Sequence, residues 1–231
     1  MRLPKLPASI LAFLLVNFSL NTFSQTDFKL KFKRSQVYAG IEVGSKGVKM
    51  SVLEVGRNAQ NTGTFNLLKD TSVNTDFISF NARSFAASLQ ALQNLYGKAT
   101  GDYKILPANI YTVISSGVVV QAEKEKKTPM VQALADSFKM RIGEPQRLVT
   151  LVDVAEGARL SHLGIVPEAK RYSTFVIDIG SGNTKGGYFP NADTKDIKLY
   201  QLGWGTKSVA NDTEKRLDDD KSLANFKKQL Y

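Results

Sequence analysis

Cysteine is absent from this chain of 231 residues, and histidine occurs once, as His162. Without cysteine there is no disulfide, no thiol nucleophile and no thiolate metal site. One histidine cannot build a multi-histidine metal centre, and it leaves a single imidazole base for any serine triad. Whatever chemistry the protein performs must therefore rely on carboxylates, hydroxyls, lysines and backbone amides.

Negative charge is also scarce, because 31 lysines and arginines face 21 acids, for a formal net charge of +10. Such a balance favours anionic partners, including phosphate polymers, nucleic acid and acidic lipid, although many exported proteins are simply basic. We expect no specific nucleic-acid recognition, because no aromatic-studded groove or recognition helix is apparent. The hydrophobic content of 42% suffices for one large domain or two small ones.

The first 24 residues are typical of a signal peptide. Arg2 and Lys5 precede a short apolar stretch over 10–18, and Thr22 and Ser24 provide small residues before a cleavage point. This stretch is too short for a comfortable, stable membrane span. We therefore expect an exported protein, periplasmic or secreted, in which 25–36 form a linker.

Hydrophobic periodicity predicts an α/β protein whose second half restarts the pattern of its first. Three strands, alternating helices and strands, and then three strands and a helix follow one another. The strands are expected at 37–43, 47–55, 62–73, 109–115, 147–153, 174–179, 184–189 and 196–202, and the helices at 81–96, 128–141, 155–163 and 206–217. Thr128 is expected to cap the second helix, with Pro129 in its first position.

A short motif occurs twice, once in each strand-rich region. The first copy reads IEVGSKGVK over 41–49, and the second reads IDIGSGNTK over 177–185. Each has an acid at the end of a strand, a turn of glycine and serine, and a lysine seven residues after the acid. A pair of ordinary hairpins is the alternative interpretation, and the repetition favours a binding role.

Turns of this kind suit phosphate groups. Glycine permits a positive φ and close approach of a ligand, and successive N–H groups then converge on an anion. Hydroxyl groups add donors, and the acids Glu42 and Asp178 can hold Mg²⁺ beside the phosphates. The predicted phosphate-binding residues are Gly44, Ser45, Lys46, Gly180, Ser181, Gly182, Asn183, Thr184 and Lys185.

These motifs resemble the actin, heat-shock-70 and sugar-kinase superfamily, and within it the exopolyphosphatase and guanosine pentaphosphate phosphohydrolase (Ppx/GppA) family. The narrower resemblance rests on the segments ISSG over 114–117, VAEGARL over 154–160 and GWG over 203–205. It implies actin-like (ribonuclease H-like) lobes, each built on a mixed five-stranded sheet, with 37–171 as the first lobe and 172–231 as the start of a truncated second lobe.

The resemblance also implies a site and a reaction. Phosphate chains would bind between the lobes with Mg²⁺, Ser116 and Gly117 would contact phosphate, and Glu156 would be the general base that activates water. The chain departs from the family at Glu42, where aspartate is usual, and at Lys185, where glutamate is usual. Both departures put catalysis in question. Lys46 and Gly47 stand where an Asn-Ser pair is typical of the family, and Lys46 and Lys185 together would make the cleft more cationic.

Three functions stay open on this basis. The first is an exopolyphosphatase-like hydrolase that releases phosphate from polyphosphate or a related phosphoanhydride with the help of Mg²⁺. The second is a catalytically degenerate protein that holds polyanions, and the third is a nucleotide-driven assembly protein, which export argues against. Unpaired sheet edges in an open second lobe would favour association, with a homodimer as one outcome.

Overall fold

The computed structural model describes residues 28–230. Two sheets form two lobes, with a five-stranded sheet in order β3-β2-β1-β4-β5 and a three-stranded sheet in order β6-β7-β8. The predicted signal peptide lies outside the described residues. Within them, no helix has the length and apolar character needed to cross a bilayer.

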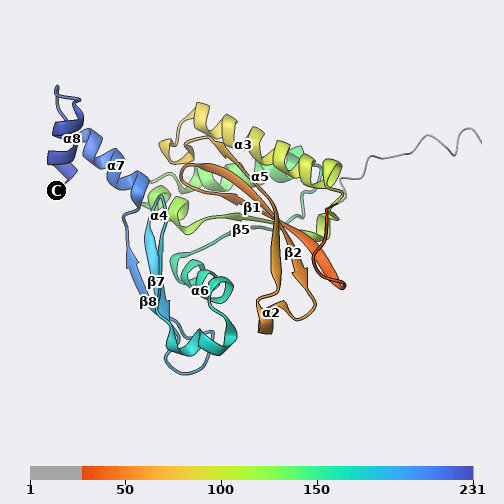
Figure 1. Ribbon diagram of the computed structural model, residues 1–231. Coiled ribbons are helices and arrows are strands. Elements are labelled where there is room, and N and C mark those ends of the chain that lie inside the picture. Colours follow the sequence, from red (N-terminus) through yellow and green to blue (C-terminus); the bar gives the residue numbers. More distant parts are fainter. Residues whose placement is uncertain (1–27, 231) are drawn as a thin grey trace, which may run out of the picture.

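The first sheet is mixed, as the sequence predicts. Its strands are β1 (Ser35–Val43), β2 (Gly47–Gly56), β3 (Phe65–Asn74), β4 (Ile110–Ile114) and β5 (Val149–Leu151). β1 pairs antiparallel with β2 and parallel with β4, so its last residue Val43 lies beside Val48 and Ile114. Helices α3 (Ala82–Gly97) and α5 (Thr128–Arg141) cover one face of this sheet (Figure 1).

Alternation along the strands explains which face is covered. Ile41, Met50 and Ile114 are fully buried and share the core with side chains of α3 and α5, including Leu92 and Phe138. Intervening positions point to the other face, as expected for a sheet with one buried side. The predicted start of α3 is confirmed, because the Asn81 side chain accepts a hydrogen bond from the Ser84 N–H.

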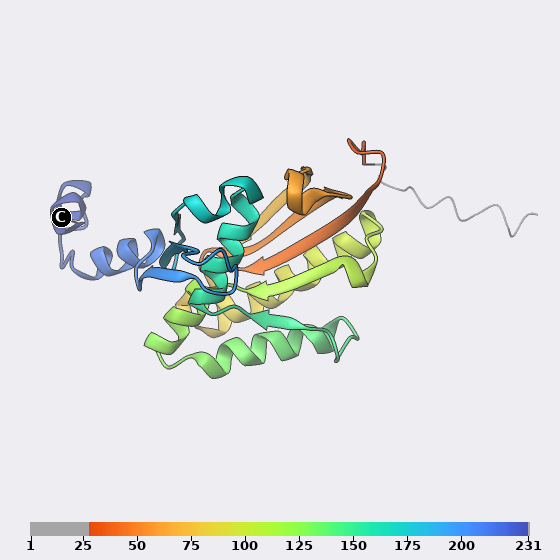
Figure 2. The same cartoon turned by 90° about the horizontal axis from the view of Figure 1, so that it is seen from below.

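The second sheet is a meander of β6 (Val176–Ile179), β7 (Thr184–Tyr188) and β8 (Lys198–Leu202). Helix α6 (Val154–Ile165) contacts β6 and β7 on one face of it. Helices α7 (Thr206–Lys215) and α8 (Leu223–Leu230) then extend away from the body of the molecule, as Figure 2 shows from below.

Several local expectations need correction. Helix α4 (Ser116–Lys124) occupies a segment for which no helix was predicted, and so does α8. The residue that caps α5 is Lys127, without a side-chain bond, so Thr128 is the first helical residue and Pro129 the second. Short elements also occur between the strands and helices: α2 (Ala59–Thr62), η1 (Phe77–Ser79), η2 (Lys98–Asp102), η3 (Pro107–Asn109) and η4 (Glu168–Ser173).

The predicted linker is partly tied to the first lobe. Its last two residues belong to β1, and the N–H groups of Lys31 and Phe32 both donate to the buried carboxylate of Glu54. The ring of Phe28 packs against Tyr103 at a centroid distance of 5.3 Å. Burial of a carboxylate requires such donors, so this contact fixes the segment against β2.

Candidate functional site

The two repeated turns line one cavity between the lobes, with a volume of about 290 Å³. This size lies at the small end of the range for small-molecule sites, roughly 300–1,000 Å³. The residues that line it are Glu42, Gly44, Ser45, Lys46, Gly47, Lys49, Ser115, Gly117, Asp178, Ile179, Gly180, Ser181, Gly182, Asn183, Lys185 and Thr206. A larger hollow of about 710 Å³ lies at the other end of the β1–β2 hairpin, around Arg34 and Arg57, and contains none of the predicted site residues.

The second turn approaches the first turn closely at Gly182, next to Ser45. A methyl group at Gly182 would lie 2.3 Å from Ser45 Oγ and 2.6 Å from the Gly117 carbonyl oxygen. No Cβ tolerates such distances, so glycine is required here for close approach of the lobes. The expected positive φ is not the reason, because the described glycines with positive φ are Gly63, Gly143 and Gly187.

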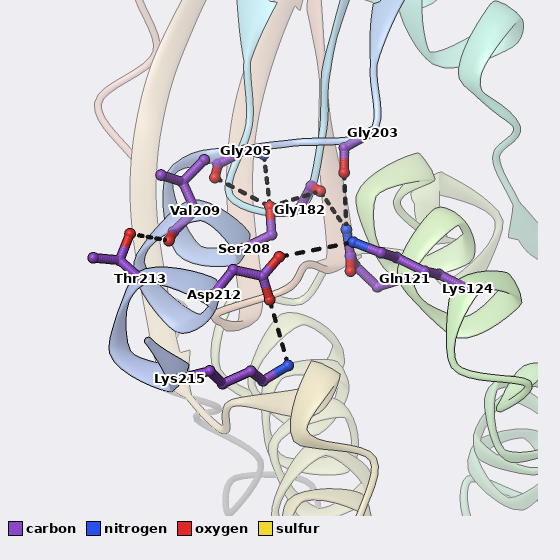
Figure 3. A network of polar contacts seen from close by, with 10 residues as sticks. All are labelled: Gln121, Lys124, Gly182, Gly203, Gly205, Ser208, Val209, Asp212, Thr213 and Lys215. Carbon is purple, nitrogen blue, oxygen red and sulfur yellow. Dashed lines mark hydrogen bonds and ion pairs between the residues drawn. The ribbon is translucent and has the colours of Figure 1, made fainter. Parts of the chain in front are cut away.

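The carbonyl oxygens of the second turn, from Gly180 to Gly182, all accept hydrogen bonds from helix α7 or helix α4. The Gly180 oxygen accepts from the Thr206 N–H, and the Ser181 oxygen accepts from the N–H groups of Lys207 and Ser208, at the start of α7. The Gly182 oxygen accepts from Gln121 Nε2 at 2.8 Å and from Ser208 Oγ at 3.3 Å (Figure 3). The start of α7 and one residue of α4 therefore fix the orientation of the turn.

N–H groups of the same peptide units face the opposite way, because the N–H and C=O of a trans peptide are antiparallel. Within the described residues, the N–H groups of Ser181, Gly182 and Asn183 have no hydrogen-bond partner, and neither do those of Ser45 and Lys46. Residues with unpaired N–H groups from both turns therefore line the same cavity. Such a cluster of amides is a concave anion-binding surface.

The start of helix α4 adds to this surface. Ser115 and Gly117 line the cavity, and the first backbone N–H groups of a helix have no partner inside it. The helix dipole places partial positive charge at the same end. Ser116 is buried and accepts a hydrogen bond from Asn183 Nδ2 at 3.4 Å, so it joins the lobes and does not line the cavity.

Three lysines and two carboxylates line the cavity, which gives it a net positive charge. Lys46 and Lys49 are exposed side chains of the first hairpin, whereas the Lys185 side chain is only 12% exposed. Lys185 Nζ lies 2.7 Å from Asp178 Oδ2. Burial raises the pKa of Asp178, but hydrogen bonds from Lys185 and Ser161 and the nearby charges of Lys185 and Lys49 hold it below its ordinary value.

One oxygen of the predicted magnesium site, Asp178 Oδ2, is already held by protein donors. Among residues 28–230, no cluster of three or more histidines, aspartates and glutamates is grouped closely enough to hold a metal ion. Of the two predicted ligands, Asp178 already accepts from Lys185 Nζ and from Ser161 Oγ, at 2.7 and 2.9 Å, on the same oxygen. A divalent cation bound to that oxygen would face the ammonium group at contact distance.

Glu156, the predicted general base, lies in the first turn of α6 and is not one of the residues that line the cavity. Both of its carboxylate oxygens accept from Arg159, at 2.7 Å each. The hydrogen bonds from Arg159 lower the pKa of Glu156, against the opposing effect of burial. Thr184 is also turned away, because its hydroxyl donates to the Trp204 carbonyl oxygen.

Sequence reasoning missed Lys49, Thr206 and Gln121. Lys49 was present in the repeated motif as the lysine that follows the acid, and its register partner is Glu42. Gln121 belongs to α4, where the spacing of Val118 and Ala122 indicates a helical face that the turn-centred interpretation overlooked. The amide of Gln121 bridges two glycine loops, through the carbonyl oxygens of Gly182 and Gly203 (Figure 3).

Comparisons with known proteins agree with this architecture. No protein-family model and no curated protein matches the chain. Among solved structures, a Ppx/GppA family member from Aquifex aeolicus is 14% identical, with a TM-score of 0.55 over 84% of this chain and 59% of that one. An exopolyphosphatase-like protein is 16% identical, with a TM-score of 0.58 over 85% and 58% of the two chains.

An exopolyphosphatase from Cytophaga hutchinsonii is 13% identical, with a TM-score of 0.54 over 77% of this chain and 53% of that one. The chain thus spans less than two thirds of each of these proteins. At such identities the likeness concerns the fold. With its mixed five-stranded sheet and paired glycine turns, the chain has the actin-like fold of the Ppx/GppA exopolyphosphatase structures.

Proposed function

We propose that this protein belongs to the Ppx/GppA family and binds the phosphate groups of a phosphoanhydride, such as polyphosphate, in the cavity between its lobes. The observation that carries the proposal is that one cavity is lined by residues of both turns with unpaired N–H groups and by Lys46, Lys49 and Lys185. Charge-assisted hydrogen bonds from amides and ammonium groups are the contacts that phosphate oxygens favour.

The composition of the cavity supports an anion over an apolar or nucleoside ligand. Its lining contains Ile179 as its one large apolar side chain, and its small volume suits a few phosphate groups. The net charge of +10 would also raise the local concentration of a polyanion. Export, predicted from residues 1–24, would favour polyphosphate over nucleotides as the ligand.

Binding is tested by titrating inorganic triphosphate into the whole chain and into Lys46→Met, with calorimetric detection. Lys46 is exposed on the first turn, so its loss removes a cation without disturbing the core. We expect affinity to fall at least tenfold, since one charge-assisted hydrogen bond contributes about 1.5–3 kcal/mol. Lys195→Met, on an exposed loop of the same molecule, is the matched control. Absence of any heat of binding in the wild type would refute the proposal.

Hydrolysis is the second candidate, favoured by the position of Glu156 directly before Gly157. A methyl group added at Gly157 would lie 2.9 Å from Cε of the cavity residue Lys185. Water would attack the terminal phosphorus, the bond to the bridging oxygen would break, and the water proton would pass to the Glu156 carboxylate. The products would be orthophosphate and a chain one phosphate shorter. For this reaction, Arg159 would have to release at least one oxygen of Glu156.

Phosphate release from long-chain polyphosphate, measured with and without Mg²⁺, tests this second candidate. We expect Glu156→Gln to lose release while retaining triphosphate binding, and Glu168→Gln, an exposed residue of η4, to behave as the wild type. Equal release by wild type and Glu156→Gln would remove Glu156 from the mechanism. Binding without release in the wild type would leave the binding function alone.

A further inference from the structure

Each acid of the repeated motif lies directly opposite a lysine on the neighbouring strand. The strand register pairs Glu42 with Lys49 in the first lobe and Asp178 with Lys185 in the second. Opposite charges at paired positions stabilise neighbouring strands and compete with other ligands of the carboxylate. The motif therefore places an acid and a cation together on both sides of the cavity.

The second of these pairs is supported by helix α6. Ser161 Oγ donates to Asp178 Oδ2 at 2.9 Å, on the oxygen that also accepts from Lys185 Nζ. Gly157 leaves room for the lysine, because a methyl group there would lie 2.9 Å from Lys185 Cε and 3.1 Å from Ser116 Oγ. A glycine and a serine, one helical turn apart on α6, thus hold the Lys185 side chain and its partner in place.

This arrangement puts a fixed positive charge against Asp178, one of the two predicted magnesium ligands. Lys185 lines the cavity beside the amide-rich second turn, and its side chain is mostly shielded from solvent. An ammonium has three donors, so Lys185 can keep its bond to Asp178 and donate to a ligand oxygen as well. Limited exposure strengthens such contacts because solvent screens them less.

We propose that the Lys185 ammonium, held by Asp178, is the built-in counter-cation of the cavity, so that condensed phosphate binds without a divalent metal. The inference rests on the proposed phosphate-binding function and specifies how that function is achieved. Asp178 is then a positioning residue for Lys185 and not a metal ligand. The acid–lysine register pair in the first lobe makes Lys49 the corresponding cation on the opposite wall.

Calorimetry on the whole chain tests the inference with two probes. Inorganic triphosphate is titrated in EDTA, and Mg²⁺ alone is titrated in the absence of phosphate. We expect triphosphate to bind in EDTA, Lys185→Met to weaken that binding at least tenfold, and Lys195→Met to leave it unchanged. We also expect Mg²⁺ alone to produce no saturable heat.

Asp178→Asn separates the role of the cation from a general effect on folding. This variant removes the negative charge of the carboxylate but keeps an amide oxygen that can accept from the Lys185 ammonium, so triphosphate binding in EDTA should persist. Thermal unfolding of both variants reports their integrity. Triphosphate binding that requires Mg²⁺, saturable Mg²⁺ binding that disappears in Asp178→Asn, or unchanged binding by Lys185→Met would each overturn the inference. Failure of triphosphate to bind under any condition would instead refute the proposed function itself.

Discussion

The two sheets of this molecule use apolar residues differently. In the first sheet, Ile41 and Ile114 are fully buried under α3 and α5. In the second, Ile177 and Tyr200 flank Gly186 of the central strand, and Ile179 and Leu202 flank Thr184. These apolar side chains are exposed, Ile177 by 56% and Ile179 by 67%. The first lobe is thus stabilised by a covered core, whereas one face of the second sheet remains in contact with water.

Because the second sheet has this exposed apolar face, the second glycine turn is stabilised differently from the first. An apolar hollow of about 490 Å³ lies between this exposed face and the last two helices, lined by residues including Leu202, Trp204 and Phe226. With little covered apolar area of its own, the second turn depends on hydrogen bonds from α7 and from Gln121 of the first lobe. The Lys124 ammonium, 4.5 Å from the centre of the Trp204 ring, adds a contact between the lobes.

A leucine-to-alanine substitution in each lobe is the strongest test of this difference in burial. Leu134→Ala removes a fully buried side chain of α5 and should lower the free energy of unfolding by about 2–5 kcal/mol. Leu202→Ala removes a side chain that is 46% exposed, and should cost less than about 1 kcal/mol. Urea denaturation measures both. Equal losses would mean that the outer face of the second sheet is covered in solution, and repeating the experiment at two protein concentrations would reveal a second copy.

Contact between the lobes is tested by Gly182→Ala. The added methyl group would overlap Ser45 Oγ and the Gly117 carbonyl, so the two turns must separate, at a cost of about 1–3 kcal/mol. We expect triphosphate affinity to fall about tenfold, as calorimetry would measure. Gly164→Ala is the matched control, because nothing lies within 4 Å of a methyl group at that position of α6. An unaltered affinity in Gly182→Ala would mean that the cavity does not require the observed approach of the turns.

Acid stability of the first lobe depends on Glu54, which belongs to that lobe alone. Burial raises the pKa of Glu54, but hydrogen bonds from the Lys31 N–H, Ser35 hydroxyl, Phe32 N–H and Asn66 amide outweigh it and lower the pKa to about 2. A carboxyl group with a depressed folded pKa stabilises the protein above its unfolded pKa, about 4.3, and this contribution is lost as pH falls toward 2.

Glu54→Gln should therefore flatten the decline of unfolding free energy between about pH 4.3 and pH 2. Chemical denaturation at several pH values measures this slope, with Glu168→Gln as a surface control. An unchanged slope would show that other groups control acid unfolding and that residues 31–35 are not fastened through this carboxylate.

Periodicity and turn chemistry predicted much of the fold. Alternation predicted the first two strands to within two residues, and the spacing of apolar residues over 81–96 located α3. Helix α4 was missed because the ISSG segment drew attention as a turn, although Val118 and Ala122 begin a buried helical face immediately after it. Helix α8 was missed as well, and none of its side chains is buried.

Part of the candidate site was also foreseeable. The repeated motif placed both turns at strand ends, and the fold then brought them together around one cavity. The predicted roles of Glu156, of Asp178 and of the phosphate-binding residues remain predictions, and neither export nor the domain boundaries are tested by residues 28–230. What the motif could not indicate is that Arg159 holds Glu156 and that Lys185 holds Asp178, since each depends on side-chain packing in α6.

By itself, the sequence determined the absence of thiol chemistry, the excess of positive charge, and the local strand–turn–strand units, because these depend on composition and on contacts between neighbouring residues. Only the tertiary structure decided that the two glycine turns meet, that Gly182 permits their contact, and which cationic side chain pairs with each carboxylate. The physical reason is distance along the chain: Ser45 and Gly182 meet through packing of separate elements, which no local pattern encodes.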